Sequence, residues 1–147
     1  MHRIAILNGP NLNRLGTREP DIYGSETFAD LKHRCEAHSK KSGIALEFRQ
    51  SNFEGDIVES VHYAIDHVDG LIINPAGLTF TSVPVMDALK MFSGPKVELH
   101  ISNVHTREDI YHKSLMSAVV TAVMAGLGTD GYIHALDWMK NALSKAG

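Results

Sequence analysis

The stretch Arg3-Ile-Ala-Ile-Leu-Asn8 is a continuous apolar run that ends at Gly9 and Pro10. Runs of this length bounded by Gly and Pro are typical of a strand in a parallel sheet that is covered on both faces. Three further strands are predicted at residues 44–49, which alternate or run apolar, and at residues 70–74 and 96–102, and longer segments with a helical period separate them. Because parallel strands need such crossovers, the pattern predicts an α/β fold with a parallel β-sheet covered by helices on both faces.

The segments between these runs predict the helices. The first begins after an N-cap at Ser25 and ends at Gly43, which is a common helix terminator. Further helices are predicted at residues 56–68, 82–92, 118–126 and 130–145. No linker or repeat interrupts the alternation, so residues 1–147 are expected to form one domain.

Composition excludes several classes of protein. With 14 Lys and Arg against 17 Asp and Glu, the net charge is −3, and no basic excess indicates a nucleic acid or an anionic membrane as a partner. The single cysteine, Cys35, excludes an internal disulfide framework and a zinc site with several cysteines. No apolar run reaches the ~18 residues that a membrane span requires, and the first is too short for a signal peptide. We therefore expect a cytoplasmic protein.

Chemistry in a sheet of this kind is expected in the loops after the carboxyl ends of the strands. In this chain those loops are residues 8–23, 50–54, 74–81 and 100–107. The glycine pattern from Gly126 to Gly131 also matches a dinucleotide fingerprint, but it follows a predicted helix rather than a strand. We therefore do not expect a nucleotide site there.

The loop after the first strand offers a possible base. Tyr23 lies five residues after Arg18, and a phenol with a pKa near ~10 becomes a useful base only when a cation stabilises its phenolate. The alternative is that Tyr23 only anchors the loop over the sheet.

The fourth strand offers a possible acid. Glu98 and His100 alternate along it, so their side chains share one face and the carboxylate can orient the imidazole. His100 is then a candidate general acid, although a purely structural pair is the alternative. The main-chain N–H groups of Ile101 and Ser102, with the Ser102 hydroxyl, can receive a substrate carboxylate. Asn74 ends the third strand, where an amide donor is expected to point into the same crevice. This set suits removal of a proton beside a carbonyl followed by loss of a hydroxyl group.

Four motifs carry a resemblance to a known family. They are Asn8-Gly-Pro-Asn-Leu-Asn-Arg-Leu-Gly-Thr-Arg-Glu-Pro-Asp-Ile-Tyr-Gly24, Gln50-Ser-Asn-Phe-Glu-Gly55, Ile73-Asn-Pro-Ala-Gly-Leu-Thr79 and Val97-Glu-Leu-His-Ile-Ser-Asn-Val-His105. In these motifs the chain resembles the type II 3-dehydroquinate dehydratases. The resemblance implies a flavodoxin-like three-layer sandwich and a lyase of the shikimate or quinate pathway. It also implies a small-molecule substrate, no cofactor or metal, and trimers assembled into a homododecamer.

The resemblance also implies roles for individual residues. Tyr23 would remove the C2 proton, with its pKa lowered by Arg18, and Asn11 would hold a water that stabilises the enolate. His100, oriented by Glu98, would protonate the departing C1 hydroxyl.

The substrate-binding residues follow in the same way. Asn74, Ile101 and Ser102 would bind the carboxylate, and Asp87 would reach the active site of a neighbouring subunit.

Two positions depart from the family pattern. Phe80 stands where the family has a histidine, and Tyr111 stands where it usually has an arginine; in the family both contact ring hydroxyls of the substrate. Loss of such a donor costs about 1–3 kcal/mol for the substrate that used it.

Three hypotheses follow from the two departures. The chain is an active 3-dehydroquinate dehydratase in which Tyr111 or His112 substitutes for the arginine, an enzyme that performs the same elimination on a related cyclic hydroxy-keto acid, or a non-catalytic ligand-binding homologue.

Overall fold

The computed structural model describes residues 1–17, 21 and 25–146. Its centre is a parallel sheet in the order β2-β1-β3-β4-β5. The strands are β1 (His2–Asn8), β2 (Ile44–Gln50), β3 (Gly70–Asn74), β4 (Lys96–His100) and β5 (Ala122–Ala125). The main helices are α2 (Phe28–Ser42), α3 (Glu54–His67), α4 (Val83–Met91) and α5 (Asp130–Ala146). This order is that of the flavodoxin-like sheet, which confirms the predicted fold class.

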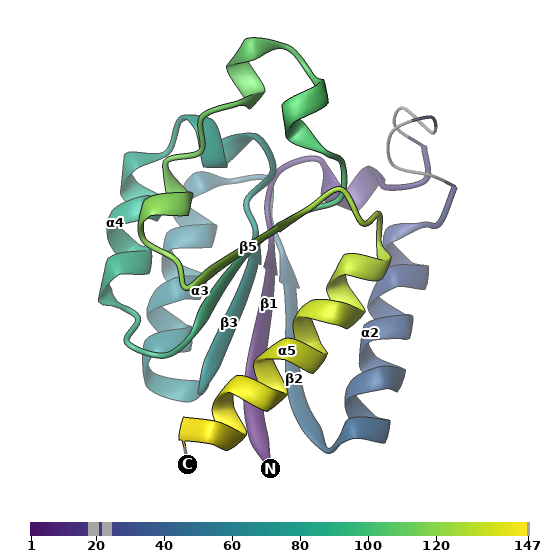
Figure 1. Cartoon of the computed structure of the whole chain (residues 1–147), viewed down its shortest axis with the longest axis vertical. Helices are drawn as coiled ribbons and strands as arrows, with labels where there is room; N and C mark the ends of the chain where they lie inside the picture. Colours follow the sequence, from purple (N-terminus) through teal and green to yellow (C-terminus); the bar gives the residue numbers. More distant parts are fainter. Residues whose placement is uncertain (18–20, 22–24, 147) are drawn as a thin grey trace.

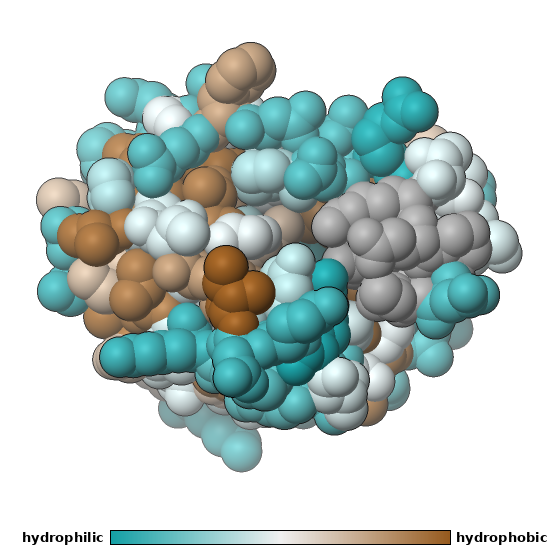
Figure 2. All heavy atoms as spheres, turned by 90° about the horizontal axis from the view of Figure 1, so that it is seen from above, coloured by the Kyte–Doolittle hydropathy of each residue, from teal (hydrophilic) through white to brown (hydrophobic). Residues whose placement is uncertain are grey.

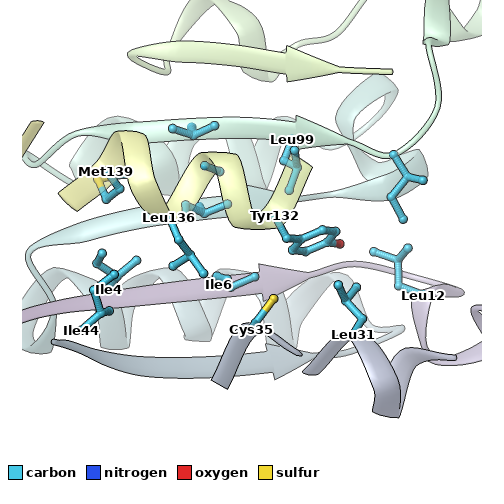
Figure 3. Close-up of a cluster of buried hydrophobic side chains, with 14 of the residues drawn as sticks. Ile4, Ile6, Leu12, Leu31, Cys35, Ile44, Leu99, Tyr132, Leu136 and Met139 are labelled. Carbon is cyan, nitrogen blue, oxygen red and sulfur yellow. The ribbon is translucent and has the colours of Figure 1, made fainter. Parts of the chain in front are cut away.

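Helices cover both faces of the sheet, with α2 and α5 on one side and α3 and α4 on the other (Figure 1). Successive residues of β1 therefore enter opposite cores. Ile4 and Ile6 pack in the cluster under α2 and α5, where Tyr132 and Leu136 face them (Figure 3). Ala5 belongs to the cluster under α3 and α4. Burial on both faces explains why the strand is continuously apolar rather than alternating.

The N-cap of the first helix lies two residues after the predicted one at Ser25. Thr27 is the N-cap: its hydroxyl accepts from the Asp30 N–H at 3.1 Å, and the Thr27 N–H donates to the Asp30 carboxylate at 3.1 Å. This reciprocal pair satisfies two otherwise unpaired N–H groups, so it outcompetes a cap at Ser25. The predicted end at Gly43 is correct, since that residue adopts φ 71°, which glycine allows.

The predicted helix at residues 118–126 is wrong. That segment contains a short 3-10 turn, Met116–Ala118, followed by the edge strand β5. Val97 of β4 pairs with Ala122, and the Thr121 N–H donates to the Lys96 carbonyl at 2.8 Å. Pairing with β4 therefore overrides the local preference of these small residues.

Because β5 replaces the predicted helix, the glycine pattern from Gly126 to Gly131 follows a strand. Its amides are nevertheless occupied, because Gly126 donates to the His100 carbonyl at 3.3 Å and Gly128 donates to the Ile101 carbonyl at 3.0 Å. At the start of α5, Asp130 pairs with Arg34. The pattern thus joins β5 to the end of β4, and the expectation of no nucleotide site there is kept for this reason.

The strand register gathers the polar strand ends at one edge of the sheet. Asn8 lies opposite both Gln50 and Asn74, and His100 lies opposite Ala125. The loops that follow these residues stand above this edge in Figure 1. Among the described residues, no helix has the length and apolar character needed to cross a membrane.

Candidate active site

A pocket of about 250 Å³ opens at the carboxyl edge of the sheet. Figure 2 views the molecule from this edge and shows polar and apolar surface interleaved there. The loops after β1, β3 and β4 build the pocket, as the fold predicts. The predicted site residues that line it are Asn11, Asn74, Phe80, His100, Ile101, Ser102 and Tyr111.

A buried hydrogen-bonded pair, Glu98 and His100, lies at the end of β4. The ring N–H at Nε2 of His100 donates to Oε2 of Glu98, and the two residues are 6% and 1% exposed. Because this bond places a proton on Nε2, the other ring nitrogen, Nδ1, is the one that can exchange a proton with a substrate. The prediction that these two side chains share one face is therefore confirmed.

Hydrogen bonds keep Glu98 ionised despite its burial. The Ser117 hydroxyl donates to Oε1 at 2.7 Å, and the Thr79 hydroxyl donates to Oε2 at 3.3 Å. Burial alone would raise the pKa of Glu98, but the bonds from His100 and Ser117 outweigh it and hold that pKa below its ordinary value. The carboxylate therefore remains a stable acceptor that can stabilise a protonated imidazole.

Asn74 is held by a buried network as well as lining the pocket. Its Nδ2 donates to the Tyr132 hydroxyl at 2.9 Å, and its Oδ1 accepts from the Ala76 N–H at 3.1 Å. The Tyr132 hydroxyl in turn donates to Oδ1 of Asn8 at 2.7 Å. Burial raises the pKa of Tyr132 and keeps this phenol protonated. The bond to Tyr132 commits one hydrogen of the Asn74 amide, and the other hydrogen is available to a substrate.

Ile101 and Ser102 lie just past the last paired residues of β4. Pairing with β3 ends at Glu98 and pairing with β5 ends at His100, so the N–H groups of both residues lie beyond the ladder. Both residues line the pocket. Main-chain N–H groups in this position suit an anionic oxygen such as a carboxylate.

Asn11 adopts φ 73°, a left-handed conformation that asparagine tolerates better than most residues. Its N–H donates to Oδ1 of Asn52 at 2.9 Å, and Gln50 donates to both that oxygen and the Gly9 carbonyl. The loop after β2 thereby fixes the loop after β1, and with it the place of Asn11 in the pocket.

The two positions that depart from the family pattern touch one another. The rings of Phe80 and Tyr111 meet edge to face, with centroids 5.4 Å apart at 83°. Phe80 also stacks on His100, with centroids 6.3 Å apart at 20°. On Tyr111 lies the guanidinium of Arg107, whose Cζ is 3.8 Å from the ring centroid. His112 bonds the Arg107 carbonyl at 2.6 Å and lines a smaller adjoining cavity that also includes His100 and Tyr111, so its substitution for the arginine stays a prediction.

Sequence reasoning missed three residues of this region. Arg107 lines the pocket, and Thr79 and Ser117 hold Glu98. A signal for Arg107 existed, because it lies in the loop after β4 that was expected to carry chemistry. The contacts of Thr79 and Ser117 with a residue about 19 positions away have no such local signal.

Three further predicted residues are not among the described residues that line the pocket. Tyr23 and Arg18 lie outside the described residues, so their roles stay predictions. Asp87 lies on α4, where it pairs with Lys90 at 3.6 Å, and does not line the pocket of its own chain. Cys35, in contrast, is fully buried in the core. Across the described residues, no group of three or more His, Cys, Asp and Glu side chains is arranged to hold a metal ion.

Comparisons with known proteins agree on one family. The family model for dehydroquinase class II matches residues 2–140. The chain is 51% identical over 140 residues to a 3-dehydroquinate dehydratase of Bartonella tribocorum, covering 95% of this chain and 94% of the relative. It is 50% identical over 137 residues to catabolic 3-dehydroquinase 1 of Fusarium vanettenii, covering 93% of this chain and 95% of the relative. The crystal structure of a type II dehydroquinase from Propionibacterium acnes aligns with a TM-score of 0.93 at 41% identity, covering 96% of this chain and 97% of that one.

Proposed function

The chain belongs to the class II dehydroquinase family, and we propose that its pocket dehydrates 3-dehydroquinate to 3-dehydroshikimate. The observation that carries this proposal is the buried Glu98–His100 pair that opens onto the pocket beside the strand-end amides. A carboxylate-supported imidazole is a proton donor, and the amides are an anion site, which is what the elimination of water from a hydroxy acid needs.

The substrate would be placed by its carboxylate. C1 of 3-dehydroquinate carries both the carboxylate and the leaving hydroxyl. With the carboxylate on the N–H groups of Ile101 and Ser102 and on Asn74, the hydroxyl on the same carbon faces His100, the neighbouring residue in the chain. Binding in this way holds the reacting groups together before any bond changes.

The proposed elimination consists of two proton transfers. Tyr23, as a phenolate stabilised by Arg18, takes the proton from C2, and the electron pair forms an enolate with the C3 carbonyl. Asn11 supports the enolate oxygen through a water molecule. The C1–O bond breaks as His100 donates its proton to the hydroxyl, and water leaves with formation of the C1–C2 double bond. Glu98 stabilises the imidazolium before this transfer.

We further propose that the chain assembles into trimers and a homododecamer in which Asp87 completes a neighbouring site. Asp87 lies on α4, and two large apolar side chains at the ends of that helix, Val83 and Met91, are 49% and 61% exposed. Exposed apolar side chains beside a charged one suit a subunit interface. Size determination by light scattering tests this, and a monomer at micromolar concentration would contradict it.

The proposed location of the protein is the cytoplasm, because a single buried thiol suits a reducing compartment.

Turnover of 3-dehydroquinate tests the main proposal directly. The product is a conjugated acid whose ultraviolet absorbance rises as it forms. We expect His100→Ala to lower kcat by about 10²–10⁴-fold, as loss of a general acid does. His62→Ala, at an exposed position on α3, is the matched control and should retain the wild-type rate. No turnover by the wild type at millimolar 3-dehydroquinate would contradict the proposal, as would full activity of His100→Ala.

A further inference from the structure

The pocket has an aromatic wall, formed by Phe80 and Tyr111, directly beside the proposed acid. The Phe80 ring is nearly parallel to the His100 ring, at 20°, and meets Tyr111 at 83°. The Tyr111 face is covered by the Arg107 guanidinium at 3.8 Å. Contacts with neighbours on both sides therefore fix the position of Tyr111 in the wall.

Most polar groups of the described lining engage one side of the substrate in the proposed binding mode. In the binding mode proposed above, the groups on C1 and the oxygen on C3 engage Asn11, Asn74, His100, Ile101 and Ser102. The remaining ring carbons that carry hydroxyls in 3-dehydroquinate are C4 and C5. Of the other described side chains that line the pocket, only those of Arg107 and Tyr111 can form hydrogen bonds.

Phe80 is the residue of this wall that stacks on the acid, and it offers no donor or acceptor. A ring hydroxyl placed against its face leaves water without gaining a hydrogen bond, which is unfavourable. A CH₂ group at the same position loses nothing and gains apolar contact. The wall therefore favours a ring edge with fewer hydroxyl groups.

We propose that this pocket accepts a cyclic hydroxy-keto acid that lacks the C4 or the C5 hydroxyl at least as well as it accepts 3-dehydroquinate, with Phe80 as the specificity-determining residue. The proposal rests on the function proposed above, because the same acid, anion site and elimination act on the less hydroxylated ring. The reaction is unchanged: the C2 proton is removed, the C1 hydroxyl leaves as water, and no further reactant is needed.

The experiment compares kcat/KM for 3-dehydroquinate and for its 4-deoxy and 5-deoxy analogues. For the wild type, we expect at least one analogue to be used as well as 3-dehydroquinate or better. Phe80→His places an N–H donor on a planar ring of similar shape, so it should shift the preference about tenfold toward 3-dehydroquinate. Phe80→Leu is the matched control: it keeps the position apolar and should leave the ratio of the two kcat/KM values within about threefold of the wild type.

The outcomes separate this proposal from the proposed function. A wild type that uses 3-dehydroquinate more than threefold better than both analogues would overturn the proposal while leaving the dehydratase function intact. An unchanged ratio in a folded Phe80→His variant would overturn the role of Phe80, and if that variant does not fold, the wild-type ratio alone decides. No turnover of any of the three compounds would overturn the dehydratase function and the proposal together.

Discussion

Replacement of Tyr132 by phenylalanine should damage the fold and the site together. Its hydroxyl is fully buried and bridges two strands, donating to Asn8 of β1 at 2.7 Å and accepting from Asn74 of β3 at 2.9 Å. Tyr132→Phe leaves one buried carbonyl oxygen and one buried N–H without this partner. At about 1–3 kcal/mol for each of these two unsatisfied groups, the free energy of unfolding should fall by about 2–6 kcal/mol.

Urea unfolding measures this loss. Trp138, the only tryptophan, packs against the same core and reports unfolding by its fluorescence. With a slope of about 2 kcal/mol per molar urea, the midpoint should fall by about 1–3 M at fixed protein concentration. Tyr63→Phe is the matched control, because it removes a part-buried bond to Glu47 at 3.1 Å and should cost about 1 kcal/mol or less. Equal midpoints for the two variants would refute the reasoning about stability. Tyr132→Phe should also change KM, because Asn74 loses a restraint on its orientation. An unchanged KM would therefore refute the link between this network and the site.

Three further changes test other parts of the structure. Ser117→Ala removes a bond that lowers the pKa of Glu98, so that pKa should rise and the acid limb of the pH profile of kcat/KM should move to higher pH; an unmoved limb would count against the assigned contact. Burial raises the pKa of the Cys35 thiol to about 12, so iodoacetamide at pH 8 should modify it only after denaturation, and rapid labelling of the native protein would contradict this. Gly9→Ala would place a Cβ 2.3 Å from the Pro75 carbonyl oxygen, so the variant should lose several kcal/mol of stability or fail to fold, and a wild-type melting temperature would exclude this steric account.

Much of the fold could be predicted because burial on both faces makes the central strands apolar. Apolar runs identified β1 and β3, shorter apolar stretches interrupted by charged residues identified β2 and β4, and the glycine at 43 marked the end of α2 correctly. β5 escaped because it is a four-residue edge strand, and one of its residues, Val123, is 53% exposed. Its identity is set by hydrogen bonds to β4, which no window of local sequence contains.

The site could be predicted to a similar depth for a similar reason. Strand ends are recognisable in the sequence, so Asn74, His100 and Ser102 could be assigned to one edge of the sheet from their positions along the chain alone. Side-chain contacts between loops have no comparable signal. The Tyr111 position could be seen to differ from the family, but its use as a platform for Arg107 depends on the path of a loop that carries no strong pattern.

The case of Glu98 shows what the three-dimensional arrangement adds. Burial of a carboxylate costs several kcal/mol unless it is paired and hydrogen-bonded, and alternation along β4 supplies only one partner, His100. The other two donors come from turns on either side in sequence, Thr79 at residues 76–80 and Ser117 at residues 116–118.

The pKa of Glu98 sets the pH range in which its carboxylate is charged. Burial raises this pKa, but the hydrogen bonds from His100 and Ser117 outweigh burial and hold it below its ordinary value, so the pair contributes to stability above that ordinary pKa and loses its contribution as the pH falls through the lowered one. The same ionisation is what lets Glu98 orient a protonated imidazole. The strand therefore places Glu98 beside His100, while the two turns supply further hydrogen bonds to its carboxylate.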